Sequence, residues 1–130
     1  MTELNQIYKC NVCGNVVELV HASSGELVCC GQAMQLLNEN TEDAAVEKHV
    51  PVVERTDVGM RVRVGEVVHP MEKDHHIEWV EVLAGVKSCK KFLRADVDLP
   101  EAEFELQDDS VVVRAYCNLH GLWKAEFSQR

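Results

Sequence analysis

Hydrophobic and polar residues alternate along most of the chain after Val50, which is the pattern of strands with one buried face. The alternation is clearest over residues 60–64, 77–82 and 111–116. Turn-forming residues separate these runs at 57–59, 84–85 and 107–110. About seven short strands at this spacing predict an antiparallel, immunoglobulin-like β-sandwich in a mainly β protein.

The first 37 residues follow a different pattern, in which glycines interrupt short apolar runs. Residues 16–20 and 26–28 are too short and too rich in β-branched side chains for helices, and Ser-Ser-Gly at 23–25 predicts a turn between them. About 35 residues bury too little apolar surface to fold unaided. We therefore expect residues 1–37 to form a small module around a metal ion.

A polar, acidic stretch at about 38–46 predicts a linker, so that residues 38–130 would form the sandwich domain. Only residues 42–48 favour a helical turn, and Pro51 would end it because the residue before a proline is extended.

The composition limits the classes of partner. The chain of 130 residues carries 13 Lys and Arg against 22 Asp and Glu, a net charge of −9, and has no basic tract to follow a phosphate backbone. It lacks 18 consecutive apolar residues, and its first residues do not resemble an export signal. These features predict a soluble, cytoplasmic protein that binds neither nucleic acid nor a membrane.

Six cysteines and six histidines direct attention to metals, because disulfides are rare in a reducing cytosol. Cys10 and Cys13 form a Cys-x-x-Cys-Gly knuckle, and Cys29 and Cys30 are adjacent. Adjacent residues of an extended chain point to opposite faces, so this second pair can share an ion only if the backbone bends. A zinc ribbon and disulfides are the alternatives. The pairing over residues 8–31 resembles the desulforedoxin module, in which four thiolates hold one iron for electron transfer or structure.

A second group of ligand candidates comes from the sandwich region: His49, His69, His75, His76, Cys117 and His120. The Cys-x-x-His spacing lets a thiolate and an imidazole meet one metal across a tight turn, whereas alternation lets only one of His75 and His76 do so. Such a set suits iron or copper. A blue-copper centre is the rival, although residues 121–124 offer no axial Met. His21 and Cys89 are expected to be a solvated histidine and a free thiol.

Four motifs carry a closer resemblance: the cysteine pairs, Glu-Lys-His-Val-Pro-Val at 47–52, His-Pro-Met at 69–71 and Tyr-Cys-Asn-Leu-His-Gly at 116–121. In order and spacing the chain resembles desulfoferrodoxin, the two-iron superoxide reductase family, over nearly its whole length. The resemblance implies one iron on four cysteines: Cys10, Cys13, Cys29 and Cys30. It implies a second iron with four equatorial histidines and an axial cysteinate: His49, His69, His75, His120 and Cys117.

The same resemblance implies an activity, the reduction of superoxide to hydrogen peroxide without evolution of dioxygen. Lys48 would attract the anion, and Glu47 would occupy the sixth position of the ferric iron. A rubredoxin-like electron donor and a homodimer are also implied. Two other function classes stay open: a non-catalytic iron electron carrier, and a structural or metal-storage protein with zinc on the four cysteines.

Overall fold

The structure is a computed structural model that describes residues 1–42 and 49–129. The chain divides into two compact units, unit 1 (Met1–Asn38) and unit 2 (Glu39–Arg130). The regular elements of the described residues are all strands, which confirms the mainly β prediction. None of the described residues belongs to a helix long and apolar enough to cross a membrane. The helical turn predicted at 42–48 lies outside the described residues, except for Glu42.

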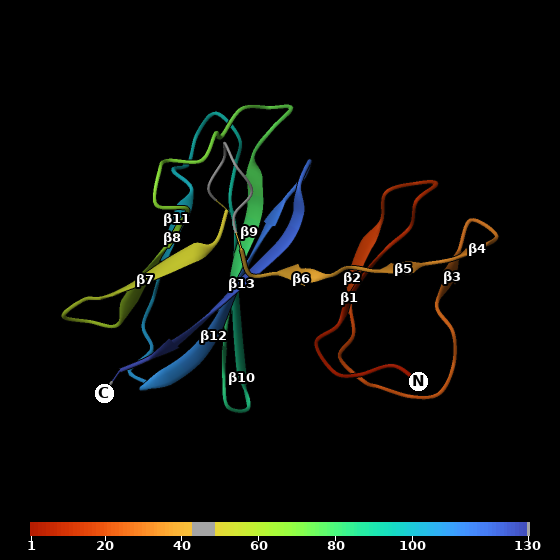
Figure 1. The fold of residues 1–130 in the computed structure, drawn as a ribbon, viewed down its shortest axis with the longest axis horizontal. Coiled ribbons are helices and arrows are strands. Elements are labelled where there is room, and N and C mark those ends of the chain that lie inside the picture. The colour runs from red at the N-terminus through yellow and green to blue at the C-terminus, as the bar shows by residue number, and fades with distance from the viewer. Residues whose placement is uncertain (43–48, 130) are drawn as a thin grey trace. The chain divides into compact units, whose positions relative to one another are not determined.

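Unit 1 is built from very short strands (Figure 1). One sheet has the order β2-β1-β5, and a hairpin of β3 and β4 completes the unit. The strands are β1 (Ile7–Lys9), β2 (Val16–Glu18), β3 (Val28–Cys29), β4 (Gln32–Ala33) and β5 (Gln35–Leu36). Only Ile7 and Cys10 of its described residues are buried apolar side chains. Unit 1 therefore has almost no hydrophobic core.

Unit 2 is the predicted β-sandwich (Figure 1). One sheet has the order β10-β9-β12-β13-β6, and the other has the order β11-β8-β7. The larger sheet contains β6 (Glu39–Asn40), β9 (Ile77–Ala84), β10 (Lys87–Phe92), β12 (Ser110–Cys117) and β13 (Gly121–Ser128). The smaller sheet contains β7 (Pro51–Arg55), β8 (Met60–Val64) and β11 (Glu101–Phe104).

The alternating residues of these strands fill the space between the two sheets. Met60, Val62 and Val64 of β8 are fully buried, whereas Arg61 and Arg63 between them point outward to Glu54 and other acidic side chains. Burying one such aliphatic side chain contributes about 1.5–3 kcal/mol. The period-two pattern thus set the inner face of the sandwich as predicted.

One strand differs from the antiparallel prediction. β6 lies within the expected linker and pairs in parallel with β13, through Leu122 and Trp123. The Asn40 side chain donates to the Leu122 carbonyl at 3.0 Å, and Glu39 forms an ion pair with Arg114 at 3.2 Å. Two polar residues show no alternation, so the pattern gave no sign of this strand.

A bulge interrupts the pairing of β9 and β12 at the end nearest the candidate histidines. Tyr116 pairs with Trp79, but Cys117 pairs with Ile77, so Glu78 is an extra residue in β9. A bulge of this kind bends its strand and redirects the side chains beyond it. In the segment that leads into β9, the side chains of His75 and His76 therefore point to the sides opposite to those that regular alternation from Trp79 would give.

Candidate metal centres

The first cluster joins the two cysteine pairs of unit 1. After β1, the turn of residues 10–15 is closed by hydrogen bonds from Gly14 N to Cys10 O at 2.9 Å and from Cys10 N to Asn15 O at 2.8 Å. Gly14 has a φ of +85°, which glycine adopts without steric cost. This turn holds Cys10 and Cys13 on one side of the cluster.

The second pair bends as its spacing requires. Cys30 has a φ of +52° and Gly31 a φ of +75°, so the backbone turns into the left-handed region directly after β3. As a result the Cys29 and Cys30 sulfurs lie 3.9 Å apart, and those of Cys13 and Cys29 lie 3.7 Å apart. Four thiolates about 2.3 Å from one ion form a regular tetrahedron with edges of about 3.8 Å. The four sulfurs, all within 4.8 Å of one another, fit a single tetrahedral metal.

The electrostatics of this cluster suit a thiolate site. The N–H groups of Cys13 and Val12 each donate to Cys10 Sγ at 3.4 Å and lower the pKa of that thiol to about 6. Hydrogen bonds with Cys13 and Cys29 raise the pKa of Cys30 to about 12. Without metal the cluster thus holds one thiolate readily and resists a second ionisation, which a bound cation would reverse. All six cysteines, each a described residue, are free thiols rather than disulfides.

The second cluster draws its side chains from five places in unit 2. His49 lies two residues before β7 begins, His69 follows β8 in a loop, and His75 precedes β9. Cys117 ends β12 and His120 lies in the turn to β13. Gly121 closes that turn with a φ of +85°. The ends of both sheets of the sandwich therefore supply the cluster.

The four imidazoles close a ring. Each packs edge-on against two others, with centroid distances of 4.6 Å for His49–His69, 4.9 Å for His69–His75, 5.1 Å for His75–His120 and 5.0 Å for His120–His49. The interplanar angles are 62–80°. His49 and His75 are thus opposite corners of a square, as are His69 and His120. Four ligands placed in this way surround one ion equatorially.

The thiolate completes the donor set. Cys117 Sγ lies 3.8 Å from His120 Nδ1, and donor atoms of His49, His69, His75 and Cys117 all lie within 4.8 Å of one another. The Nε2 atoms of the first three histidines are buried. The Nδ1 atom of His69 lies 2.7 Å from the Pro70 carbonyl, which fixes the proton on Nδ1 and directs the Nε2 lone pair inward. One thiolate with four imidazoles fits a single iron.

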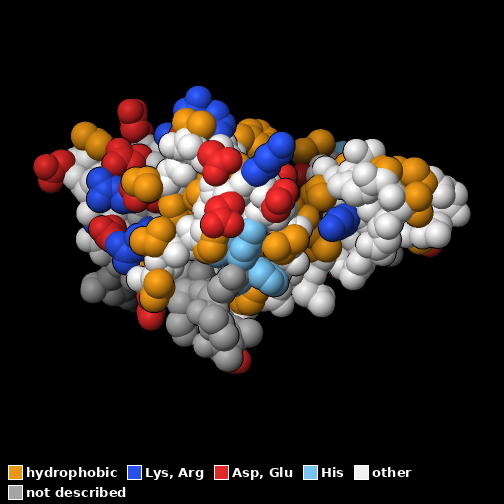
Figure 2. Space-filling model, turned by 90° about the horizontal axis from the view of Figure 1, so that it is seen from above, with side chains coloured by type: hydrophobic (Ala, Val, Ile, Leu, Met, Phe, Trp, Pro, Cys, Tyr) orange, Lys and Arg blue, Asp and Glu red, His pale blue; other side chains and the backbone are white. Residues whose placement is uncertain are grey.

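Aromatic packing supports one side of the cluster. The Trp123 ring stacks on His49 at 4.6 Å with an interplanar angle of 13°, and its Nε1–H donates to the His120 carbonyl at 3.1 Å. His49, His69 and Cys117 are buried, whereas His120 is exposed. On the face shown in Figure 2, histidine side chains reach the surface in a patch bordered by hydrophobic and acidic side chains. The cluster therefore lies close to solvent.

Other residues singled out in the sequence have different settings. Glu47 and Lys48 lie outside the described residues. The Nδ1 atom of His76 lies 3.0 Å from the Glu72 carbonyl, so His76 is the one of the adjacent pair that does not join the ring. His21 is exposed, and Cys89 is half-buried on β10. Asn118, which the sequence did not single out, bonds to the segment that carries His75.

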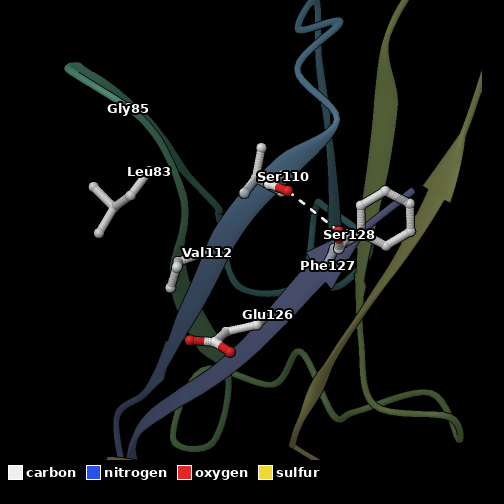
Figure 3. Close-up of a pocket in the computed structure, with 8 residues that line it drawn as sticks. Leu83, Gly85, Ser110, Val112, Glu126, Phe127 and Ser128 are labelled. Atoms are coloured by element: carbon white, nitrogen blue, oxygen red, sulfur yellow. Dashed lines mark hydrogen bonds between the residues drawn. The ribbon is translucent and has the colours of Figure 1, made fainter. Parts of the chain in front are cut away.

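A separate depression of about 520 Å³ lies on unit 2 beside the β9–β10 turn (Figure 3). Its lining includes Leu83, Val112 and Phe127, with Ser110 and Ser128 joined by a 3.2 Å hydrogen bond. Glu126 is its one titratable group. This hollow contains none of the candidate ligands, so the chemistry resides in the two clusters.

Comparison with known proteins agrees with both clusters. The family model described as desulfoferrodoxin matches residues 41–126, and the model of the desulfoferrodoxin N-terminal domain matches residues 2–37. A desulfoferrodoxin from Nitratidesulfovibrio vulgaris is 59% identical over 121 residues, which cover 93% of this chain and 95% of that protein. A desulfoferrodoxin homolog from Methanothermobacter thermautotrophicus is 56% identical over 95% of this chain and 99% of its own length.

Solved structures agree with the fold. The superoxide reductase from Treponema pallidum has a TM-score of 0.75 and 30% identity, covering 92% of this chain and 96% of that one. The superoxide reductase from Nanoarchaeum equitans has a TM-score of 0.55 and 30% identity, covering 70% of this chain and 99% of that one. The two clusters correspond to the two iron centres of the matched family. The chain belongs to the desulfoferrodoxin family.

Proposed function

We propose that the protein is a superoxide reductase, an enzyme that reduces superoxide by one electron to hydrogen peroxide without releasing dioxygen. The observation that carries the proposal is the closed ring of four imidazoles with the Cys117 thiolate beside it. Relatives named superoxide reductase share this fold at 30% identity. The proposed ligands of the second iron are His49, His69, His75, His120 and Cys117.

Five protein donors, from four histidines and Cys117, would hold one iron ion and would leave it able to bind a small anion. When bound there, ferrous iron would supply the one electron that superoxide takes up, and water would supply the two protons of hydrogen peroxide. Neutral histidines and one thiolate leave a net positive charge on the loaded site, which attracts an anion. Cys117 is fully buried, so its negative charge acts at low dielectric and donates electron density effectively.

Side chains around the ring hold the histidines in place. Trp123 stacks on His49 and thereby restricts rotation of that imidazole and excludes water from its outer face. The Pro70 carbonyl fixes the His69 tautomer. A ligand set oriented in advance in this way loses little free energy in reorganisation when the electron leaves.

Glu47 and Lys48 have proposed roles that follow from the family motif and from their position next to His49 in the sequence. A protein with a net charge of −9 repels superoxide at long range, so a local cation is needed near the site. Lys48 would supply that charge. Glu47 would bind as the sixth ligand after oxidation and so assist the departure of the product.

Rapid mixing of the reduced protein with superoxide tests the activity. The expected result is one hydrogen peroxide and no dioxygen per superoxide consumed; half a dioxygen per superoxide would identify a dismutase instead. No reaction by an iron-loaded protein would favour a non-catalytic electron carrier. Lys48→Ile should slow the second-order rate constant about tenfold or more with both irons retained, since it removes the attracting charge. An unchanged rate constant would contradict the role of Lys48.

The finer assignments are proposals as well. Residues 1–37 would act as the desulforedoxin-like module and residues 38–130 as the catalytic domain, with a rubredoxin-like protein re-reducing the second iron. Exposed apolar side chains on unit 1, among them Val17, Val28 and Leu36, support a homodimer, because a second copy would cover them. Free thiols throughout the chain are consistent with a cytoplasmic location. Sedimentation of the iron-loaded protein measures the oligomeric state.

A further inference from the structure

The turn that carries His75 is held from both sides. The backbone of His75 forms a two-way bridge with Glu72, from Glu72 N to His75 O at 2.9 Å and from His75 N to Glu72 O at 3.1 Å. Lys73 and Asp74 form the tip of this turn and are exposed. This bridge fixes the shape of the turn, whereas contacts with other segments fix its position against the rest of the cluster.

The side chain of Asn118 connects this turn to the end of β12. Its Oδ1 accepts a hydrogen bond from His76 N–H at 2.9 Å, and its Nδ2 donates to the Asp74 carbonyl at 2.9 Å. Its backbone N–H donates to the His76 carbonyl at 3.2 Å. One carboxamide therefore bonds to the residues on either side of His75, while its own chain neighbour is Cys117.

We propose that Asn118 is a positioning residue that holds His75 in register with Cys117 and His120. The inference rests on the proposed function only in taking these three residues as ligands of one iron. Regular pairing of β9 and β12 ends at Cys117–Ile77, just past the bulge. Beyond that point the Asn118 carboxamide replaces a peptide group and continues the ladder by one step, so that loop and strand end move together.

Only a carboxamide provides the donor and the acceptor at this spacing. In Asn118→Asp, the acceptor for His76 N–H stays, but a carboxylate oxygen would face the Asp74 carbonyl and repel it. In Asn118→Leu, the size of the side chain is kept and both hydrogen bonds are lost. Gln107→Glu is the matched control, because it converts an amide into a carboxylate in an exposed loop of unit 2.

The test uses the full-length, iron-loaded protein and measures the transfer of ferrous iron to a competing chelator under argon. Outer partners of metal ligands typically contribute 10- to 100-fold to metal affinity. Both Asn118 variants should therefore release the histidine-bound iron about tenfold faster or more, and the ferric absorption and electron paramagnetic resonance of that iron should change. The four-cysteine iron is the internal reference, and the control should behave as the wild type.

Wild-type iron release and spectra in both variants would overturn the proposal. So would variants whose metal-free stability falls while their iron affinity stays unchanged, because Asn118 would then serve only the fold. If Asn118→Leu does not fold, Asn118→Asp decides the question. None of these readouts uses superoxide, so an inactive wild type that holds two irons would refute the proposed function and leave this inference standing.

Discussion

The two units of this protein differ in how far their folding depends on a metal cluster. Unit 1 buries only two apolar side chains among its described residues, and one of them is the candidate ligand Cys10. Unit 2 has a continuous core of 14 buried residues, at one end of which lies Cys117. The four-cysteine cluster is thus the centre of its unit, whereas the histidine cluster is attached to a scaffold that other residues stabilise.

This difference bears on whether each metal can keep a coordination position open for a reactant. A metal that holds a unit together needs saturated coordination, and the four sulfurs of unit 1 provide it. A metal carried by an independent scaffold can keep a position for a reactant without cost to the fold. The unit with the better core is therefore the one suited to catalysis.

Removal of both metals should have the largest effect and should affect the stability of the two units differently. We expect chelation under reducing conditions to unfold unit 1 and to leave unit 2 folded, because about 35 residues without a core depend on metal binding for their folding free energy. Hydrogen exchange measures the result: amides of the β1–β2 ladder should lose protection, and those of the β9–β12 ladder should keep it. Protected β1 amides in the metal-free protein would contradict this expectation, and reloading with iron is the control.

Arg114→Met should destabilise unit 2, because it removes one partner of a buried ion pair. Arg114 and Glu81 are both fully buried, with a hydrogen bond of 2.8 Å from Arg114 Nε to Glu81 Oε1. Removing the cation leaves the Glu81 carboxylate buried without Arg114, with Lys90 at 3.6 Å, a change that costs about 3–5 kcal/mol. Urea unfolding followed by the fluorescence of Trp79 and Trp123 measures it. Glu103→Gln, at an exposed pair with Arg61, should have a much smaller effect.

Substitution of one apolar residue in each unit should also change the stability of the two units by different amounts. Met60→Ala should destabilise unit 2 by about 2–5 kcal/mol, because Met60 is fully buried in the core. Val20→Ala should change the stability of unit 1 by less than about 0.5 kcal/mol, because Val20 is 84% exposed. Urea unfolding reports the first change, and exchange protection in β1 and β2 reports the second. Equal effects would show that unit 1 has more core than its burial indicates.

The smallest effect should come from two paired carboxyl groups of unit 2. A hydrogen bond with Arg94 holds the pKa of Asp98 below its ordinary value of 3.8, and one with Lys87 does the same for Asp108. A depressed carboxyl pKa gives stability that is complete above the unfolded value and is lost as the pH falls below it. The melting temperature of Asp98→Asn should lie slightly below that of the wild type at pH 6. The two temperatures should converge as the pH falls below the ordinary carboxyl pKa of 3.8, and a constant difference would contradict the assignment.

Much of the fold followed from local pattern, because strands such as β8 bury alternate residues. The required bend at Cys29–Cys30 also followed, since alternation forbids a shared ion without it, and Cys30 has the left-handed φ that provides the bend. Alternation did not decide between His75 and His76, because the decision depends on the bulge at Glu78. A bulge is a property of two paired strands and leaves no trace in one of them.

Two further features, strand β6 and the contacts of Asn118, could not be predicted from the local sequence pattern, because they too depend on residues far away in the chain. β6 is a strand because Leu122 and Trp123 offer it an edge, although Glu39 and Asn40 have no strand pattern of their own. Asn118 binds backbone groups at residues 74–76, which any sequence would present. The ligands were visible as residue types with chemical preferences, whereas their supports are visible only in space.

The extra residue in β9 has a consequence for how the gene can change. Glu78 shifts the entry of β9 by one position relative to β12, and His75 rather than His76 reaches the ring. Loss of the single codon for Glu78 would restore regular alternation and leave His75 on its side of the strand, because Cys117 already pairs with Ile77 and Asn118 already bonds to His76. One codon inserted between His75 and Ile77 would instead turn His75 to the opposite side of the strand, away from the ring, with every candidate ligand still encoded.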